Sequence, residues 1–96
     1  MIKVTAVNYL KEECVDDFLA LSKELVEKTN ALDKGCIKYE LCRAVNDPLK
    51  FIMLEEWENQ ESLDAHLKAG HFTSIVPKFG QMTSKPSDLT MLEKVY

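Results

Sequence analysis

The stretch from Phe51 to Phe72 constrains the fold more than any other part of the chain, because its pattern changes from that of a strand to that of a helix. Up to Glu58 the residues alternate in character, as expected for a strand whose two faces lie in different surroundings. One face combines large apolar side chains with a single carboxylate, namely Phe51, Met53, Glu55 and Trp57. We therefore expect a strand that leads directly into a helix.

The predicted helix has clear signals at both ends. Asn59 is a favourable N-cap, and acidic and small polar residues follow it in the first turn, where the helix dipole favours negative charge. Leu63 and Leu67 lie four residues apart and predict the buried stripe, with His66 beside it. Gly70 ends the helix. The only Trp and both His residues of the chain lie in or next to this helix, so we expect a functional site here.

Five further segments complete the predicted order of elements. They are strands at Ile2–Leu10, Gly35–Val45 and Leu89–Tyr96, a long helix over 12–32, and a short helix over 72–82 that Pro77 interrupts. The turn residues 46–48 join the second and third strands as an antiparallel hairpin. The order β-α-β-β-α-β predicts an α+β, ferredoxin-like fold, in which both helices cover one face of an antiparallel sheet.

Spacing also predicts which side chains of two elements are buried. The buried side of the long helix should contain Val15, Phe18, Leu21 or Ser22, Leu25 and Leu32. Strict alternation in the second strand places Ile37, Tyr39, Leu41 and Arg43 on one face and Cys36, Lys38, Glu40 and Cys42 on the other. Cys36 and Cys42 would then lie about 20 Å apart, too far for a disulfide, so reduced thiols are expected.

The length of the chain bears on its assembly. A chain of 96 residues is expected to form a single domain, residues 1–96. One sheet with helices on one side leaves its other face, which is rich in large apolar residues, exposed unless a second subunit covers it. We therefore expect a homodimer, a dimeric α+β barrel in which two sheets pack face to face, with a pocket between each sheet and its own helices.

Charge and hydropathy exclude several partners. The net charge of −4 is spread over interspersed acids and bases, without the basic stripe that nucleic-acid binding requires. The N-terminal residues resemble neither a signal nor a transit peptide, and no apolar run approaches the length of a membrane span. The expectation is a cytoplasmic protein without a nucleic-acid or membrane partner.

Several kinds of reactive site find no support in the sequence. His66 and His71 lie five residues apart around a Gly, and no Cys or Asp completes a ligand spacing, so no metal site is expected. Neither an activated nucleophile motif nor a Gly-rich phosphate loop occurs. Six residues could still carry chemistry, and each also has an ordinary structural explanation in the core, a cap, an ion pair or solvent: Asn8, Tyr39, Glu55, Trp57, His66 and His71.

One continuous run of about forty residues resembles the antibiotic biosynthesis monooxygenase family, whose members include quinol-monooxygenase-like proteins. The features that carry this resemblance are Gly35-Cys36, Tyr39, Asp47-Pro48, Phe51, Glu55, Trp57, Leu63, His66 and His71-Phe72. The resemblance implies a dimeric α+β barrel. It also implies a cofactor-independent monooxygenase that uses O₂ on small hydroxy-aromatic or quinol substrates.

The same resemblance implies roles for individual residues. His66 would transfer the proton, with Asn8 as a hydrogen-bond donor to the substrate and Trp57 as part of the catalytic wall. The residues expected to bind the aromatic ring or to support the edge of the pocket are Tyr39, Glu55, His71 and Phe72.

Three alternatives remain open. Haem-degrading relatives share a first-strand Asn and a strand Trp, but Val76 lies where their axial His would be expected. Another branch isomerises a small phosphorylated dione, and no obvious cluster of basic residues here would hold its phosphate. The third alternative is a non-catalytic barrel that binds a small ligand.

Overall fold

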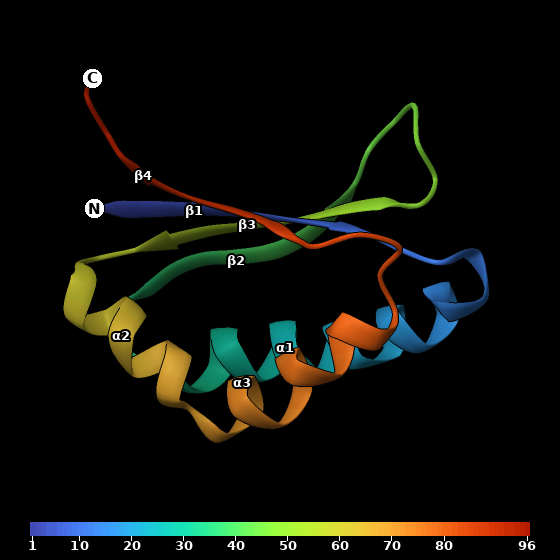
Figure 1. The fold of residues 1–96 in the computed structure, drawn as a ribbon. Coiled ribbons are helices and arrows are strands. Elements are labelled where there is room, and N and C mark those ends of the chain that lie inside the picture. The colour runs from blue at the N-terminus through green and yellow to red at the C-terminus, as the bar shows by residue number, and fades with distance from the viewer.

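The computed structural model describes residues 1–96 and confirms the predicted α+β, ferredoxin-like fold. The strands are β1 (Ile2–Tyr9), β2 (Cys36–Arg43), β3 (Lys50–Trp57) and β4 (Asp88–Glu93), and they form one antiparallel sheet in the order β2-β3-β1-β4. The helices α1 (Val15–Leu32), α2 (Gln60–Lys68) and α3 (Gly70–Ile75) all lie on one face of this sheet (Figure 1). None of them has the length and apolar character needed to cross a membrane.

Shorter elements complete the chain. A 3₁₀ turn at Glu12–Cys14 precedes α1, and a second one at Val76–Gln81 continues α3. The second turn contains Pro77, which cannot donate the backbone hydrogen bond that a continuing α-helix needs. The break predicted at this proline is therefore confirmed.

The core lies between the helices and the two central strands. The alternation predicted for β3 is confirmed, since Phe51, Met53, Glu55 and Trp57 are all buried. Phe18 of α1 packs its ring 5.4 Å from that of Phe51 and 4.8 Å from that of Phe79. These tilted aromatic contacts hold α1 and the second 3₁₀ turn against β3.

The side chain of Asn59 caps α2, as predicted. Its Oδ1 accepts hydrogen bonds from the backbone N–H of Ser62 at 2.9 Å and from the hydroxyl of Ser62 at 3.0 Å. The stripe predicted for this helix is partly wrong, because His66 is 1% exposed whereas Leu67 is 37% exposed. The helix packs through Leu63 and His66, which are three residues apart, and this leaves Leu67 at the edge of the buried face.

The stripe predicted for α1 also ends differently. Its buried residues are Phe18, Ser22, Leu25 and Thr29, whereas Leu32 is 69% exposed. The buried positions advance by steps of three or four residues, so either Leu32 or Asp33 could come next, and the structure buries the side chain of Asp33, which is 9% exposed. The helix therefore directs a carboxylate, not a leucine, toward the interior.

The faces predicted for β2 are wrong at its start, because the strand contains a β-bulge. Cys36 pairs with Trp57 and Lys38 with Glu56, which leaves Ile37 as the extra residue. Ile37 is 49% exposed, and Cys36 instead packs against the core. The bulge reverses the alternation before Tyr39, so Cys36 and Cys42 do not share a face. All three thiols are free.

Gly35 allows β2 to start beside α2. It has a φ of +83°, and a Cβ at this position would lie 2.0 Å from the Oγ of Ser62. Its carbonyl accepts a hydrogen bond of 2.9 Å from the backbone N–H of Glu58. The close approach of the two segments therefore requires glycine.

Replacing this glycine should destabilise the fold. We expect Gly35→Ala to lower the free energy of unfolding by about 1–3 kcal/mol, from the positive φ and the contact with Ser62. Urea unfolding measures the change. Gly80→Ala is the matched control, since no atom lies within 4 Å of its added Cβ. Equal effects of the two substitutions would contradict the close packing inferred at Gly35.

Candidate active site

A cavity of about 260 Å³ lies between the sheet and the helices, and most of the residues that line it are apolar. Its polar side chains are few and come from separate elements: Asn8 from β1, Tyr39 from β2, Glu55 from β3 and Ser87 from the loop before β4. Phe72 of α3 also lines it. A small apolar cavity with a few converging polar groups is the usual form of a small-molecule site.

The cavity opens toward β4, the last strand of the sheet. Leu89 and Met91 both line it, yet they are 58% and 51% exposed. They pair with Ala6 and Val4 of β1 and therefore point to the same side of the sheet as the helices. A ligand can reach the cavity past these two side chains.

Asn8 is buried and held in one orientation. Its Oδ1 accepts a hydrogen bond of 2.5 Å from the hydroxyl of Ser87, and the residue is 7% exposed. The amide nitrogen makes no hydrogen bond within the chain, so both of its N–H groups remain available as donors. Ser87 was not identified from the sequence, because it lies 79 residues further along the chain.

Glu55 is the only carboxylate that lines the cavity. One oxygen, Oε1, accepts a hydrogen bond of 3.0 Å from Nε1 of Trp57, and the residue is 8% exposed. Burial raises the pKa of Glu55 to about 7, and the hydrogen bond from Trp57 offsets only part of this effect. The group can therefore both take and give a proton near neutral pH.

The other two acidic side chains near Glu55 stay protonated. Tyr39 lies opposite Glu55 in the sheet, and burial followed by the charge of Glu55 raises the pKa of this phenol. Burial raises the pKa of Cys36 to about 11, with further contributions from Asp33 and Glu55. Tyr39 is thus a hydrogen-bond donor, and Cys36 is not an activated thiol.

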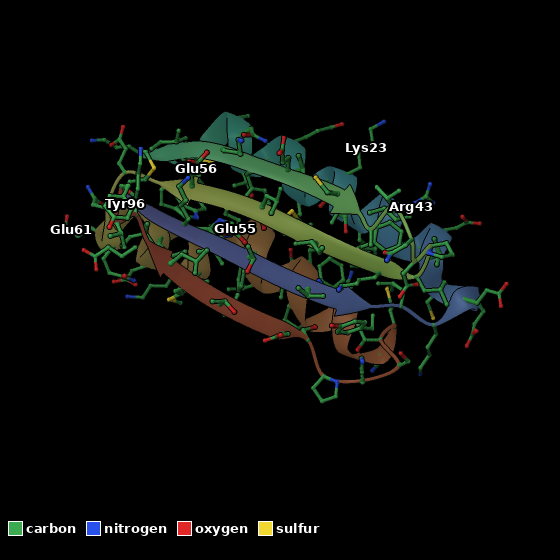
Figure 2. The ribbon with its side chains drawn as sticks, turned by 90° about the horizontal axis from the view of Figure 1, so that it is seen from above. Lys23, Arg43, Glu55, Glu56, Glu61 and Tyr96 are labelled. Atoms are coloured by element: carbon green, nitrogen blue, oxygen red, sulfur yellow. The ribbon has the colours of Figure 1, made fainter.

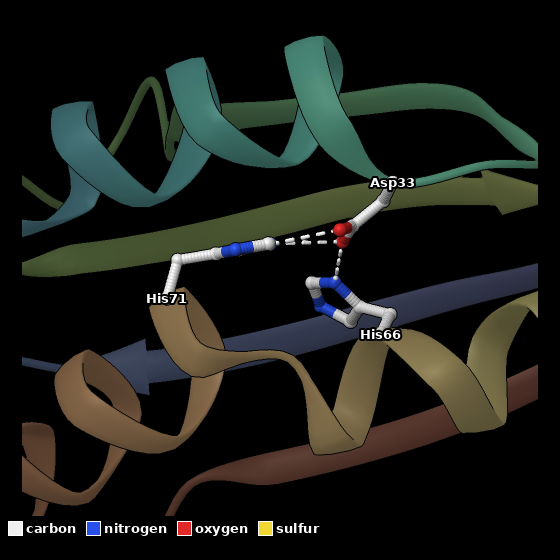
Figure 3. A group of neighbouring side chains, drawn as sticks. All are labelled: Asp33, His66 and His71. Carbon is white, nitrogen blue, oxygen red and sulfur yellow. Dashed lines mark hydrogen bonds and ion pairs between the residues drawn. The ribbon is translucent and has the colours of Figure 1, made fainter.

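Behind this wall lies a cluster of Asp33, His66 and His71 (Figure 3). The carboxylate of Asp33 accepts a hydrogen bond of 2.5 Å from Nδ1 of His66, and Nε2 of His71 lies 3.0 Å from the same carboxylate. Burial lowers the pKa of His66, and the contact with Asp33 offsets only part of that shift. His66 is therefore neutral at pH 7, with its proton on Nδ1, and its buried Nε2 has no partner.

The sequence spacing puts His66 and His71 on different faces of a helix and offers no Asp to complete a ligand set, yet the structure brings both histidines together with Asp33. Spacing along one helix was misleading, because the chain turns at Ala69 and α3 brings His71 back to His66. The missing carboxylate comes from the end of α1, where the buried stripe reaches Asp33. The three donors lie within 4.8 Å of one another and are of the type that binds divalent transition metals. In this structure each histidine bonds to the carboxylate of Asp33.

The ring of His66 packs against aromatic side chains on several sides. Its centroid lies 4.6 Å from that of Trp57, 5.0 Å from Phe72 and 5.1 Å from Tyr39. Tyr39 and Phe72 also line the cavity, whereas Trp57, His66 and His71 do not. These three residues therefore lie one layer behind the surface that a ligand would touch.

The structure thus divides the residues expected to form the site into two groups. Asn8, Tyr39, Glu55 and Phe72 line the cavity, and Trp57, His66 and His71 support it. Asn8 and Trp57 lie far apart, because Asn8 pairs with Phe51 and Trp57 lies six residues further along β3, about 20 Å at ~3.3 Å per residue.

Comparison with known proteins gives consistent matches. The family model for antibiotic biosynthesis monooxygenases matches residues 1–78. A Bacillus subtilis protein named "Putative monooxygenase YcnE" is 30% identical over 97% of each chain. The structure of a conserved protein from Methanosarcina mazei is 35% identical, with a TM-score of 0.93, and the match covers 97% of this chain and 91% of that one. A structure described as an antibiotic biosynthesis monooxygenase is 34% identical over both full chains, also with a TM-score of 0.93.

The environment of Glu55 predicts a dependence of stability on pH. Because its pKa is raised from 4.5 to about 7, the folded state retains a proton that the unfolded state releases, so this group makes stability fall as pH rises between these values. Glu55→Gln removes that effect and keeps an oxygen for Trp57. The quantity to compare is the free energy of unfolding of Glu55→Gln minus that of wild type. We expect this difference to be more favourable to the variant at about pH 8 than at about pH 5, by up to about 3 kcal/mol.

Urea unfolding of both proteins at the two pH values measures this difference. The lowered pKa of His66 contributes to the pH dependence with the opposite sign, but His66 is present in both proteins, so its contribution cancels. Glu61→Gln, at an exposed position in α2, is the control for loss of a carboxylate. A Glu55→Gln effect that is the same at both pH values would show that Glu55 titrates normally.

Proposed function

Since the chain belongs to the antibiotic biosynthesis monooxygenase family, we propose that it is a monooxygenase that oxidises small hydroxylated aromatic rings, such as quinols, without a bound cofactor. Such a ring can itself supply the electrons. When one ring C–H is oxygenated and the ring becomes a quinone, the ring gives up four electrons, one oxygen atom of O₂ enters the ring, and the other leaves as water. The protein then has to bind the ring, handle the hydroxyl proton and exclude water.

The observation that best supports this function is the composition of the cavity. Its walls are largely apolar and include the ring of Phe72 and the phenol of Tyr39, which suit a flat aromatic ligand. The free amide N–H groups of Asn8 can donate to a ring oxygen. His66, Trp57 and His71 would hold the aromatic wall in place from behind.

The lining of the cavity bears on the two alternatives. It includes no Lys or Arg, so nothing in it would neutralise the phosphate of a phosphorylated dione. A non-catalytic barrel would share the same apolar walls, but it has no need of a titratable carboxylate in them. The oxygenase is therefore the better supported function.

Oxygen consumption tests this function directly. Purified protein, without added cofactor, should consume O₂ with at least one member of a panel of quinols and polyphenols. Asn8→Ala should lower kcat/KM by about tenfold or more, because it removes the donor to the ring oxygen. Asn46→Ala, in the exposed hairpin turn, is the control and should leave turnover unchanged. Absence of uptake by folded protein across the panel would contradict an oxygenase and favour an isomerase or a ligand-binding barrel.

The second part of this proposal is a homodimer. The sheet face opposite the helices is open in the single chain (Figure 2). It carries Val7 and Ile52, which pair across β1 and β3, together with Leu54 and Leu92, and Leu92 is 44% exposed. Charged residues border this patch, with Lys3 and Lys38 both within ion-pair distance of Glu56. An apolar patch with a polar rim is typical of a protein interface.

Substitution at the middle of the patch tests the dimer. Leu54→Asp should convert a dimer to a monomer, because two sheets packed face to face would bury the new charges. Sedimentation velocity measures the mass. Val45→Asp, at a fully exposed position in the hairpin turn, is the control and should remain dimeric. Wild-type protein that sediments as a monomer would contradict the proposed barrel.

A further inference from the structure

We propose that Glu55 is the catalytic proton acceptor of this site and takes the proton of a ring hydroxyl bound in the cavity, a role that rests on the oxygenase function proposed above. The resemblance of the sequence to the family had pointed to His66 for this step. The contacts of the two side chains favour the carboxylate.

Glu55 has the required access. It lies on β3, at the centre of the sheet, and lines the cavity together with Tyr39, its partner in the β2–β3 register. Trp57 occupies only Oε1, so the second carboxylate oxygen has no protein partner. A ring held between Tyr39 and Phe72 would present its hydroxyl to the one base in the wall.

The orientation of Glu55 is fixed by the layer behind it. Trp57, which donates to Oε1, is fully buried, and its ring packs 4.6 Å from His66. His66 is in turn bonded to Asp33 at 2.5 Å. The cluster of Asp33, His66 and His71 therefore holds the tryptophan, and the tryptophan aims the carboxylate. In this arrangement His66 is a positioning residue.

His66 is poorly placed to receive the proton itself. Its Nδ1 is bonded to Asp33, and its Nε2 is buried among aromatic rings and does not line the cavity. Burial also lowers its pKa, so the charged imidazolium is disfavoured. Tyr39 keeps its own proton, since burial and the charge of Glu55 raise its pKa.

The proton transfer balances without any further reactant. The O–H bond of the ring hydroxyl breaks, its proton moves to the free oxygen of Glu55, and the electron pair stays on the ring as a phenolate. The phenolate is the electron donor to O₂. The carboxylic acid then returns the proton to the oxygen atom that leaves as water, which restores the carboxylate, and the ring supplies the second proton of that water when the C–H bond at the oxygenated carbon breaks. The titratable groups that feel the charge of Glu55 are Tyr39 and Cys36 from β2, and both are neutral near pH 7. His66 of α2 lies behind them, against Tyr39 and Trp57, and is neutral as well.

The first test uses turnover. Glu55→Gln should lower kcat by about a hundredfold or more with little change in KM, and the rise of kcat with pH near neutrality should disappear. The loss should be smaller for acidic phenols, which enter the site already ionised. Acetate should restore part of the activity of Glu55→Gly, because it can occupy the space of the missing carboxylate. Glu61→Gln is the control for the change in charge.

The second test needs no turnover. At about pH 8 the phenolate of para-nitrophenol and the carboxylate of Glu55 cannot both remain charged side by side, so binding should take up close to one proton. Calorimetry in buffers of different ionisation enthalpy measures this uptake, and Glu55→Gln should abolish it. Proton uptake by wild type without oxygen consumption on any quinol would reject the oxygenase but keep Glu55 as the group that shares the ligand's proton.

Three results would overturn the role of Glu55. One is wild-type protein that takes up no proton from the buffer with para-nitrophenol. Another is a Glu55→Gln variant that oxidises quinols with the wild-type kcat and pH profile. The third is loss of proton transfer in His66→Gln when Glu55→Gln retains it, which would assign the step to the histidine.

Discussion

The carboxylate of Asp33 is the contact on which the helical side of this protein depends. It is held at the end of α1 and accepts hydrogen bonds from one histidine of α2 and one of α3, so a single side chain joins three helices beneath the sheet. Two of those helices, α2 and α3, contribute to the wall of the cavity that lies opposite the sheet. Because hydrogen bonds to a charged group in a buried site are stronger than those between neutral groups, this junction gives a small domain a firm wall.

The wall is organised in layers that run from this junction to the cavity. Trp57 packs on His66 and donates to Glu55, so the contacts pass from the Asp33–His66 hydrogen bond, through an aromatic stack, to a carboxylate that a ligand can touch. Such support explains why the largest side chain of the chain is fully buried one layer behind the site. Residues that do not contact a ligand can therefore still decide how precisely it is held.

The elements of this fold could be predicted from the sequence where local signals act alone. The alternation of β3 and the Asn59 cap are of this kind. Prediction failed where one extra residue interrupts the alternation of a strand, as at Ile37, where the β-bulge exchanges the two faces at the start of β2. It also failed for contacts between distant segments. The residues proposed for the site were chosen by their chemical types, but Asp33 and Ser87 are distant in sequence from the side chains that they orient, and no local pattern marks them.

The position of the cavity mouth has a consequence for how this protein could diversify. Leu89 and Met91 frame the opening, and they belong to an edge strand that pairs with β1 alone. Their exposed side chains contribute little to the core, so a change of size or polarity at either position has a small energetic penalty. A lineage can therefore alter which molecules enter the cavity while Asp33, Trp57 and Glu55 stay unchanged, so that the choice of ligand and the polar groups that meet it can evolve separately.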